Sequence, residues 1–150
     1  MESVPEATTL LLDVYVAAAK AGALIALAIE ETGLSAESYA FLSILVDEGP
    51  QTPTDLAART GIALSTVVFR TRKMIAAGDL RRVPHPADRR SYLLDLTAEG
   101  RARHARARPR FRAARRAVEL RLDASPEAVQ AGIADLVRAL DAEIKERKAS

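Results

Sequence analysis

Residues 53–74 read PTDLAARTGIALSTVVFRTRKM, and this stretch decides the fold. Thr52 precedes it as a favourable N-cap, Pro53 suits the first helical position, and Asp55 lies where a capping box places an acid. Gly61 then supplies a turn position that tolerates positive φ. The pattern predicts a helix over about 53–59, a tight turn, and a second helix over about 64–77.

The spacing inside this stretch is typical of a helix-turn-helix. Ala57 is small where two helices cross closely, Gly61 follows four residues later, and Val67 falls where the second helix buries a side chain. An ordinary helical hairpin is the alternative at this point. The second helix displays polar and cationic side chains that can reach phosphates or base edges. These are Ser65, Thr66, Arg70, Arg72 and Lys73.

A basic hairpin is predicted directly after these helices. Residues 80–83 and 91–96 have strand patterns, and the tip between them contains two prolines, His85 and Asp88-Arg89-Arg90. A hairpin in this place is a wing. A wing arginine can enter a narrow minor groove, where the negative potential is enhanced, and the nearby carboxylate can hold that arginine in one rotamer. A local surface ion pair is the alternative.

Long helices are expected on both sides of this centre. The first covers about 8–31, and a second, capped by Ser35, covers about 36–48. Thr97 is expected to cap a long helix that reaches about residue 122 and is kinked or interrupted by Pro109. Ser125-Pro126-Glu127 restarts a final helix.

Positive charge is concentrated in the middle of the chain. The formal net charge is +2, yet residues 59–121 hold 17 bases against five acids, whereas residues 1–58 hold one base against nine acids. Such a block suggests a polyanionic partner, most often nucleic acid. A basic face balanced by acidic faces of the same fold is the alternative.

At this point the sequence resembles the MarR (multiple antibiotic resistance regulator) family of winged-helix transcription factors. The resemblance covers roughly residues 36–101. It is carried by Thr54-Asp55-Leu56-Ala57, Gly61, Ser65-Thr66-Val67, Gly78-Asp79-Leu80-Arg81-Arg82, Asp88-Arg89-Arg90-Ser91 and Leu96-Thr97-Ala98-Glu99-Gly100.

The resemblance implies a mainly α (α+β) fold and a single domain over residues 1–150. In it, a winged helix-turn-helix over about 36–100 lies between dimerisation helices at about 8–31 and 101–147. It implies a homodimeric repressor of nearby genes that binds a palindromic operator in double-stranded DNA, with half-sites about one helical turn apart. The recognition helix would lie in the major groove, with Arg90 in the minor groove and Asp88 as its orienting partner. The expected DNA-binding set is Ser65, Thr66, Arg70, Arg72, Lys73, His85, Asp88, Arg89 and Arg90.

The resemblance also implies release of DNA by a small aromatic or phenolic effector. Four aromatic residues near the expected dimer helices could line its pocket, although aromatic residues at helical spacing are more often core. These are Tyr15, Tyr39, Phe41 and Phe111.

Two positions depart from the family pattern. Arg70 occupies a place that is usually apolar, so either its side chain reaches outward to a phosphate or the helix rolls to bury Val68 or Phe69. Ala63 cannot cap the recognition helix, which costs ~1 kcal/mol.

A run of arginines follows the wing. It could form a cationic collar beside DNA, pair with acids of the partner subunit, or be a solvated face; Arg101 and Arg103 would be the nearest DNA neighbours. The run comprises Arg101, Arg103, Arg106, Arg108, Arg110, Arg112, Arg115 and Arg116.

Composition restricts the remaining functions. The absence of cysteine excludes thiol chemistry, and two histidines make a histidine-rich metal site improbable, so no enzyme activity, metal or cofactor is expected. No run reaches ~18 uninterrupted apolar residues and the first residues are acidic, so we expect a cytoplasmic protein without a membrane span. The competing function is a dimeric helical module that binds a protein and lacks specific DNA binding.

Overall fold

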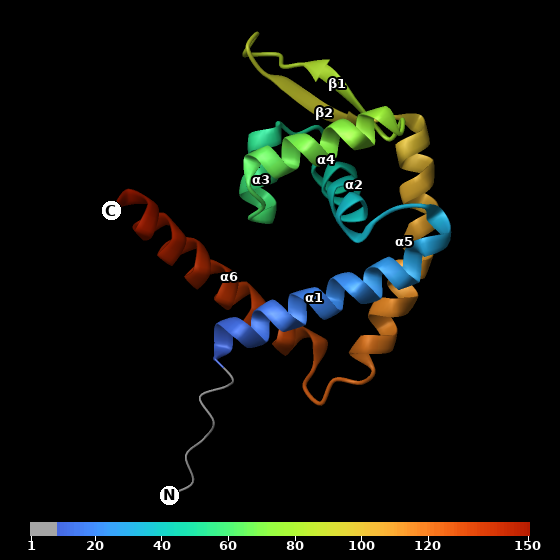
Figure 1. Ribbon diagram of the computed structural model, residues 1–150. Helices are drawn as coiled ribbons and strands as arrows, with labels where there is room; N and C mark the ends of the chain where they lie inside the picture. Colours follow the sequence, from blue (N-terminus) through green and yellow to red (C-terminus); the bar gives the residue numbers. More distant parts are fainter. Residues whose placement is uncertain (1–8) are drawn as a thin grey trace, which may run out of the picture. The chain divides into compact units, whose positions relative to one another are not determined.

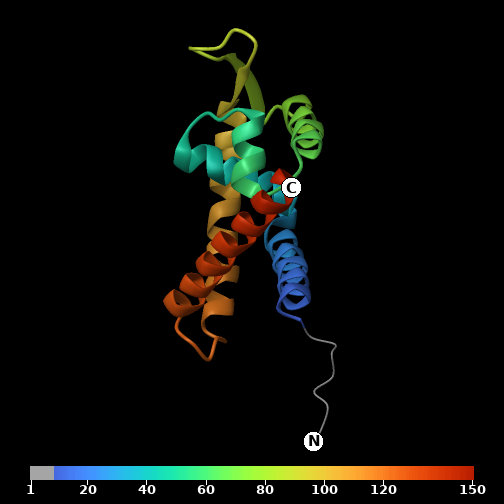
Figure 2. The same cartoon turned by 90° about the vertical axis from the view of Figure 1, so that its left-hand side faces the viewer.

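The computed structural model describes residues 9–150 (Figures 1 and 2). The described residues divide into two compact units, which meet between Arg112 and Ala113, and this boundary falls within α5. The prediction of a single domain over the whole chain therefore stays a prediction. The elements are α1 (Leu10–Ile29), a 3-10 turn η1 (Glu30–Thr32), α2 (Ala36–Glu48), α3 (Pro53–Thr60), α4 (Leu64–Ala76), β1 (Leu80–Pro84), β2 (Tyr92–Leu96), α5 (Ala98–Glu119) and α6 (Pro126–Ala149).

The helix-turn-helix forms where its local signals predict. Thr52 accepts from the backbone N–H of Asp55, and the Asp55 carboxylate accepts from the backbone N–H of Thr52, so the capping box is complete. Gly61 ends α3 in the left-handed conformation at φ 71°. No side chain caps α4 at Ala63, as expected.

The wing is a two-stranded antiparallel hairpin. Its register pairs Leu80 with Leu96 and Arg82 with Leu94. Gln51 adds a short bridge to Leu94 through two backbone hydrogen bonds of 2.7 and 3.2 Å. The predicted strands are therefore confirmed, and the segment before α3 extends the sheet by one residue pair.

Of the two outcomes predicted at Pro109, the interruption is wrong, because α5 continues from Ala98 to Glu119, whereas the kink stays a prediction. Proline removes one helical hydrogen bond, but Pro109 is exposed, so water can solvate the freed carbonyl of the preceding turn. The restart at Ser125 is confirmed, since its hydroxyl accepts from the backbone N–H of Ala128.

The core of the first unit lies between α2, the helix-turn-helix and the wing base. Apolar side chains from each of these elements bury together, which fixes the wing relative to α4. The most buried of them are Ile29, Phe41, Leu42, Leu45, Leu56, Val67, Leu80 and Leu94.

The first helix has an unusually apolar surface. Residues Leu10–Thr32 are long and apolar enough to cross a membrane by length and composition, with a mean hydropathy of 1.9. Asp13 and Lys20 interrupt the run, so a search for uninterrupted apolar residues misses it. One such helix near the N-terminus is weak evidence for a membrane span, because helices of soluble proteins pass the same test.

Candidate nucleic-acid interface

The recognition helix α4 presents one buried and one exposed face. Val67, Thr71 and Met74 recur at helical spacing and are buried, and the Thr71 hydroxyl donates to the Val67 carbonyl at 2.8 Å. Ser65 and Arg72 lie on the opposite, exposed face, whereas Thr66 is half-buried. The helix therefore offers hydroxyls and a guanidinium to solvent, all of which can contact a DNA backbone or a base edge.

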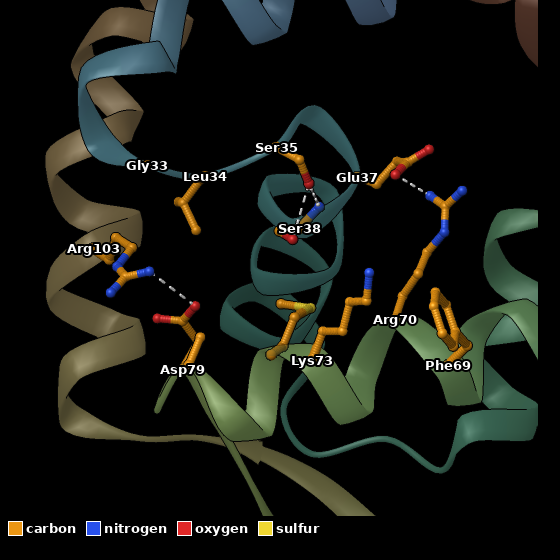
Figure 3. Close-up of a pocket in the computed structure, with 12 residues that line it drawn as sticks. Gly33, Leu34, Ser35, Glu37, Ser38, Phe69, Arg70, Lys73, Asp79 and Arg103 are labelled. Carbon is orange, nitrogen blue, oxygen red and sulfur yellow. Dashed lines mark hydrogen bonds and ion pairs between the residues drawn. The ribbon is translucent and has the colours of Figure 1, made fainter.

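Arg70 points towards α2 and forms an ion pair with Glu37 (Figure 3). Its side chain is about one third exposed. The helix does not roll to bury Phe69, whose exposed fraction is 60%. Of the alternatives for Arg70, the roll that would bury Phe69 does not occur. Thr71 takes the inward position, and its hydroxyl donates within the helix. In the absence of DNA, the charge of Arg70 is thus partly neutralised by Glu37.

Lys73 shares the exposed surface with Phe69. Its ammonium group lies 4.6 Å from the centre of the Phe69 ring, a cation–π distance. The pair explains how an exposed aromatic ring is tolerated on this helix. Phe69 was absent from the predicted site, and its exposure could be inferred from the sequence only by knowing which face α4 buries.

The wing tip is ordered by hydrogen bonds to backbone amides. The Asp88 carboxylate accepts from the backbone N–H of Arg90 at 2.9 Å, and no ion pair joins it to Arg89 or Arg90 within residues 9–150. In this structure Asp88 therefore orders the backbone of the turn, and its role in orienting the Arg90 guanidinium stays a prediction. The Nδ1 atom of His85 accepts two further amides of the tip. Arg89 and Arg90 are both exposed.

The stem of the wing carries two more arginines. Arg81 pairs with Asp95 across the strands at 2.8 Å, and Arg82 lies over the Tyr92 ring at 4.6 Å. Both contacts keep long cationic side chains along the sheet.

The base of the wing is a close contact between two loops. The Thr97 hydroxyl donates to the Asp79 carbonyl at 3.1 Å and accepts from the backbone N–H of Gly100 at 2.9 Å. A Cβ on Gly100 would lie 2.1 Å from the carbonyl oxygen of Asp79. The Leu-Thr-x-x-Gly pattern thus joins the start of α5 to the end of α4.

Asp79 is buried at this junction and pairs with Arg103 of α5 at 3.3 Å. Burial raises the pKa of the Asp79 carboxyl, although the Arg103 guanidinium acts in the opposite direction. Its Oδ1 atom has no hydrogen-bond partner among the described residues. Arg103 is therefore committed to Asp79 and Glu99 in this structure, which weakens its assignment as a DNA neighbour.

Other members of the arginine run also pair within the chain. Arg110 binds Glu31, and Arg115 binds Glu119 at 3.3 Å. Each of these pairs is solvent-exposed and contributes little to stability. For these residues the acids are intramolecular, so the interpretation of pairing with a partner subunit finds no support at Arg110 and Arg115.

The four predicted effector residues do not form one site. Tyr39 and Phe111 touch, with ring centres 5.0 Å apart, whereas Phe41 is buried in the core and Tyr15 is 76% exposed. Tyr39 also stacks on His104, a buried residue missed by sequence reasoning, whose Nε2 lies 3.0 Å from the Ser43 hydroxyl. Burial raises the pKa of Tyr39 and lowers the pKa of His104.

A cavity of about 430 Å³ lies elsewhere, between the start of α2 and α4 (Figure 3). It is mixed in character, with charged groups at its ends and apolar groups between them. Its lining includes Leu34, Glu37, Phe69, Arg70, Lys73, Met74, Asp79 and Arg103. None of the four predicted aromatic residues lines it. Within residues 9–150, no group of three or more His, Cys, Asp or Glu side chains could hold a metal ion.

These elements define a winged helix: a helix-turn-helix followed by an antiparallel hairpin that carries exposed arginines. The model of the MarR family matches residues 34–92. No curated protein sequence matches the chain. Over residues 34–92 the chain is therefore similar to the MarR family.

Solved structures extend the likeness beyond the matched region. The transcriptional regulator MOSR of M. tuberculosis, solved in complex with DNA, is 27% identical, with 90% of this chain and 98% of that chain covered at a TM-score of 0.81. A cysteine-to-serine mutant of MarR from E. coli, complexed with operator DNA, is 18% identical, with 91% and 99% covered at a TM-score of 0.78.

A third similar structure is BpsR of Bordetella bronchiseptica, whose DNA binding is regulated by 6-hydroxynicotinic acid. It is 24% identical, with 91% of this chain and 95% of that chain covered at a TM-score of 0.74. The two likenesses below 25% identity establish the shared fold, which includes the helices on both sides of the winged centre.

Proposed function

We propose that this protein is a sequence-specific DNA-binding transcriptional regulator that acts as a homodimeric repressor of nearby genes. The observation that carries the proposal is the joint placement of α4 and the wing at the end of the first unit away from α1 (Figures 1 and 2). Ser65 and Arg72 are exposed on the helix, and Arg89 and Arg90 are exposed on the wing. A helix and a basic hairpin so arranged fit the major groove and the adjacent minor groove.

The similarity to MOSR, solved with DNA, supports the same function here, and the fold shared with E. coli MarR on operator DNA agrees with it. The alternative of a protein-interaction module without specific DNA binding is not favoured, because the exposed wing arginines and the intact helix-turn-helix leave the surface suited to DNA. Such a regulator acts in the cytoplasm, where its operator is.

A gel-shift experiment with the DNA upstream of the protein's own gene tests this function. We expect a complex that survives an excess of unrelated competitor DNA. Arg90→Ala should weaken it by about 1–3 kcal/mol, because an arginine in a groove contributes on this scale. Arg138→Ala on α6 is the matched control, since Arg138 lies outside the proposed surface. A folded protein that gives no specific complex would refute the proposal.

We infer that the protein dimerises through α1 and α6, because each helix by itself carries exposed large apolar side chains. Exposed apolar surface often marks an interface. The exposed large apolar residues of these helices include Leu10, Leu11, Leu12, Tyr15, Val16, Leu24, Leu27, Ile133, Val137 and Ile144.

We infer that a small aromatic or phenolic acid relieves repression, and that the cavity beside α4 is a better candidate for its site than the four aromatic residues. The volume suits a small molecule. Arg70 and Lys73 can attract a carboxylate, and the unpartnered Asp79 oxygen can accept from a hydroxyl. The similarity to BpsR supports an effector of this class.

Titration of the protein–DNA complex with 6-hydroxynicotinate and with salicylate tests the effector proposal. Release of DNA that is lost in Lys73→Gln but kept in Tyr15→Phe supports the cavity. Release that is lost in Tyr15→Phe and kept in Lys73→Gln would move the site to the aromatic residues.

A further inference from the structure

The wing tip contains backbone amides that the cross-strand pairing of the hairpin does not satisfy. The strands end at Pro84 and Tyr92, so the intervening residues have no cross-strand partner. Pro84 and Pro86 carry no N–H, but residues 87 to 91 do. Residues 87 to 90 are exposed, so water can satisfy their amides, but an acceptor within the chain favours one conformation of the turn.

Two side chains and one backbone carbonyl supply acceptors for four of these five amides. His85 Nδ1 accepts from the backbone N–H of Ala87 at 3.1 Å and from that of Asp88 at 3.0 Å. The Asp88 carboxylate then accepts from the N–H of Arg90 at 2.9 Å, and the Asp88 carbonyl accepts from the N–H of Ser91 at 3.2 Å. The bonds form a chain that begins at His85, runs through Asp88 and ends at the backbone of Arg90.

We propose that His85 is a positioning residue for the wing, which sets the conformation of Asp88 and thereby the place from which Arg90 reaches DNA. This role differs from a direct DNA contact by His85. A single ring nitrogen accepts from both amides that precede the Asp88–Arg90 bond. This proposal rests on the proposed DNA-binding function only where it predicts a change in operator affinity.

The ring must be in one protonation form to do this. A nitrogen that accepts two N–H groups carries no proton, so Nε2 bears the hydrogen of the neutral imidazole. The two prolines beside His85 restrict the backbone at 84 and 86, which holds the ring over the turn at low entropic cost.

The first test is spectroscopic and needs no DNA. Imidazole ¹⁵N shifts of the full-length protein at neutral pH should show the Nε2–H tautomer for His85. Amide exchange at Ala87 and Asp88 should be slow relative to the neighbouring N–H of Arg89, for which the structure shows no acceptor within residues 9–150. An Nδ1–H tautomer, or equal exchange at all three amides, would overturn the proposal.

The second test uses two substitutions. His85→Leu removes the acceptor and should speed exchange at both amides. His85→Asn restores an oxygen that can accept from the amide two residues on, and should recover slow exchange at Ala87. Ala87→Ser keeps the amide and changes only an exposed side chain, so it serves as the matched control. Equal behaviour of the leucine and asparagine variants would contradict the proposed role.

A double-mutant cycle separates positioning from contact. We expect His85→Leu to weaken operator binding about tenfold in the wild-type background and less than about twofold in the Arg90→Ala background, because His85 acts through Arg90. Additive losses would show that His85 touches DNA itself and would refute positioning. If no variant and no wild-type protein binds DNA, the proposed function fails, while the tautomer and exchange results still decide the role of His85.

Discussion

Position 100 requires glycine, because the backbone of another loop lies too close for any side chain. A Cβ at this position would lie 2.1 Å from the Asp79 carbonyl oxygen, and that oxygen belongs to the backbone and cannot swing away. Gly100→Ala should therefore lower the free energy of unfolding by about 3 kcal/mol, which denaturant unfolding would measure.

Gly132 in α6 is the matched control, because no atom lies within 4 Å of the Cβ that alanine would add there. Gly132→Ala should raise stability by about 0.5–1 kcal/mol, since alanine favours the helix. Equal effects of the two substitutions would contradict the close approach at the wing base.

His104 makes stability depend on pH. Burial lowers the pKa of its ring. As the pH falls through about 6.5, the ring of the unfolded chain is protonated while the ring of the native protein is still neutral. The unfolded state then binds more protons, and the free energy of unfolding falls as pH drops below about 6.5, until the native ring also titrates.

Comparing wild type with His104→Gln between pH 7.5 and 5 isolates this effect. The variant keeps a donor for Ser43 but cannot titrate, so the stability difference between the two proteins should shrink or reverse as pH falls. The carboxyl of Asp79, whose pKa is raised by burial, has the opposite sign but is common to both proteins. Parallel pH curves would exclude His104 as the cause.

Among the elements, α3 and α4 differ in how they begin. Thr52 caps α3, whereas Ala63 leaves α4 without a side-chain cap. Ala63→Ser should raise the free energy of unfolding by about 1 kcal/mol, and Thr52→Ala should lower it by a similar amount. Thermal unfolding of both variants checks this; an unchanged midpoint for Ala63→Ser would mean that water already satisfies the α4 amides.

Local signals were sufficient to predict most elements. Ser35 and Ser125 cap the helices that the sequence places after them, and Gly61 ends α3. Pro109 misled the prediction, because a helix can pass through an exposed proline. The ends of helices depend on residues close to them in the chain, so they can be predicted from a single sequence.

The site was less predictable, since its contacts join residues far apart in sequence. Glu37 neutralises Arg70 from another helix, and Asp79 is buried by α5. The roles of His85 and Asp88 depend on which nitrogen or oxygen meets which amide in the folded tip. The sequence could identify the wing and its arginines, but not the groups that hold them in place.

At the scale of the whole molecule, the apolar surface of α1 predicts a dimer. Leu27 is 67% exposed in the single chain, so Leu27→Glu should place a charge in the interface and shift the protein to monomer at micromolar concentration. Lys20→Gln, on the same helix, should leave the dimer intact. Sedimentation velocity measures both; a wild-type protein that sediments as a monomer would contradict the interface.

Operator affinity as a function of salt measures directly whether α4 and the wing bind DNA. Fluorescence anisotropy with a labelled fragment from upstream of the gene should show log Kd changing linearly with log salt. The magnitude of this slope should be about 0.9 times the number of phosphates that the protein neutralises, because each such contact releases counterions. Arg72→Ala should reduce the slope by about one. Tight binding with no salt dependence, or no binding at low salt by a folded dimer, would contradict DNA binding through α4 and the wing.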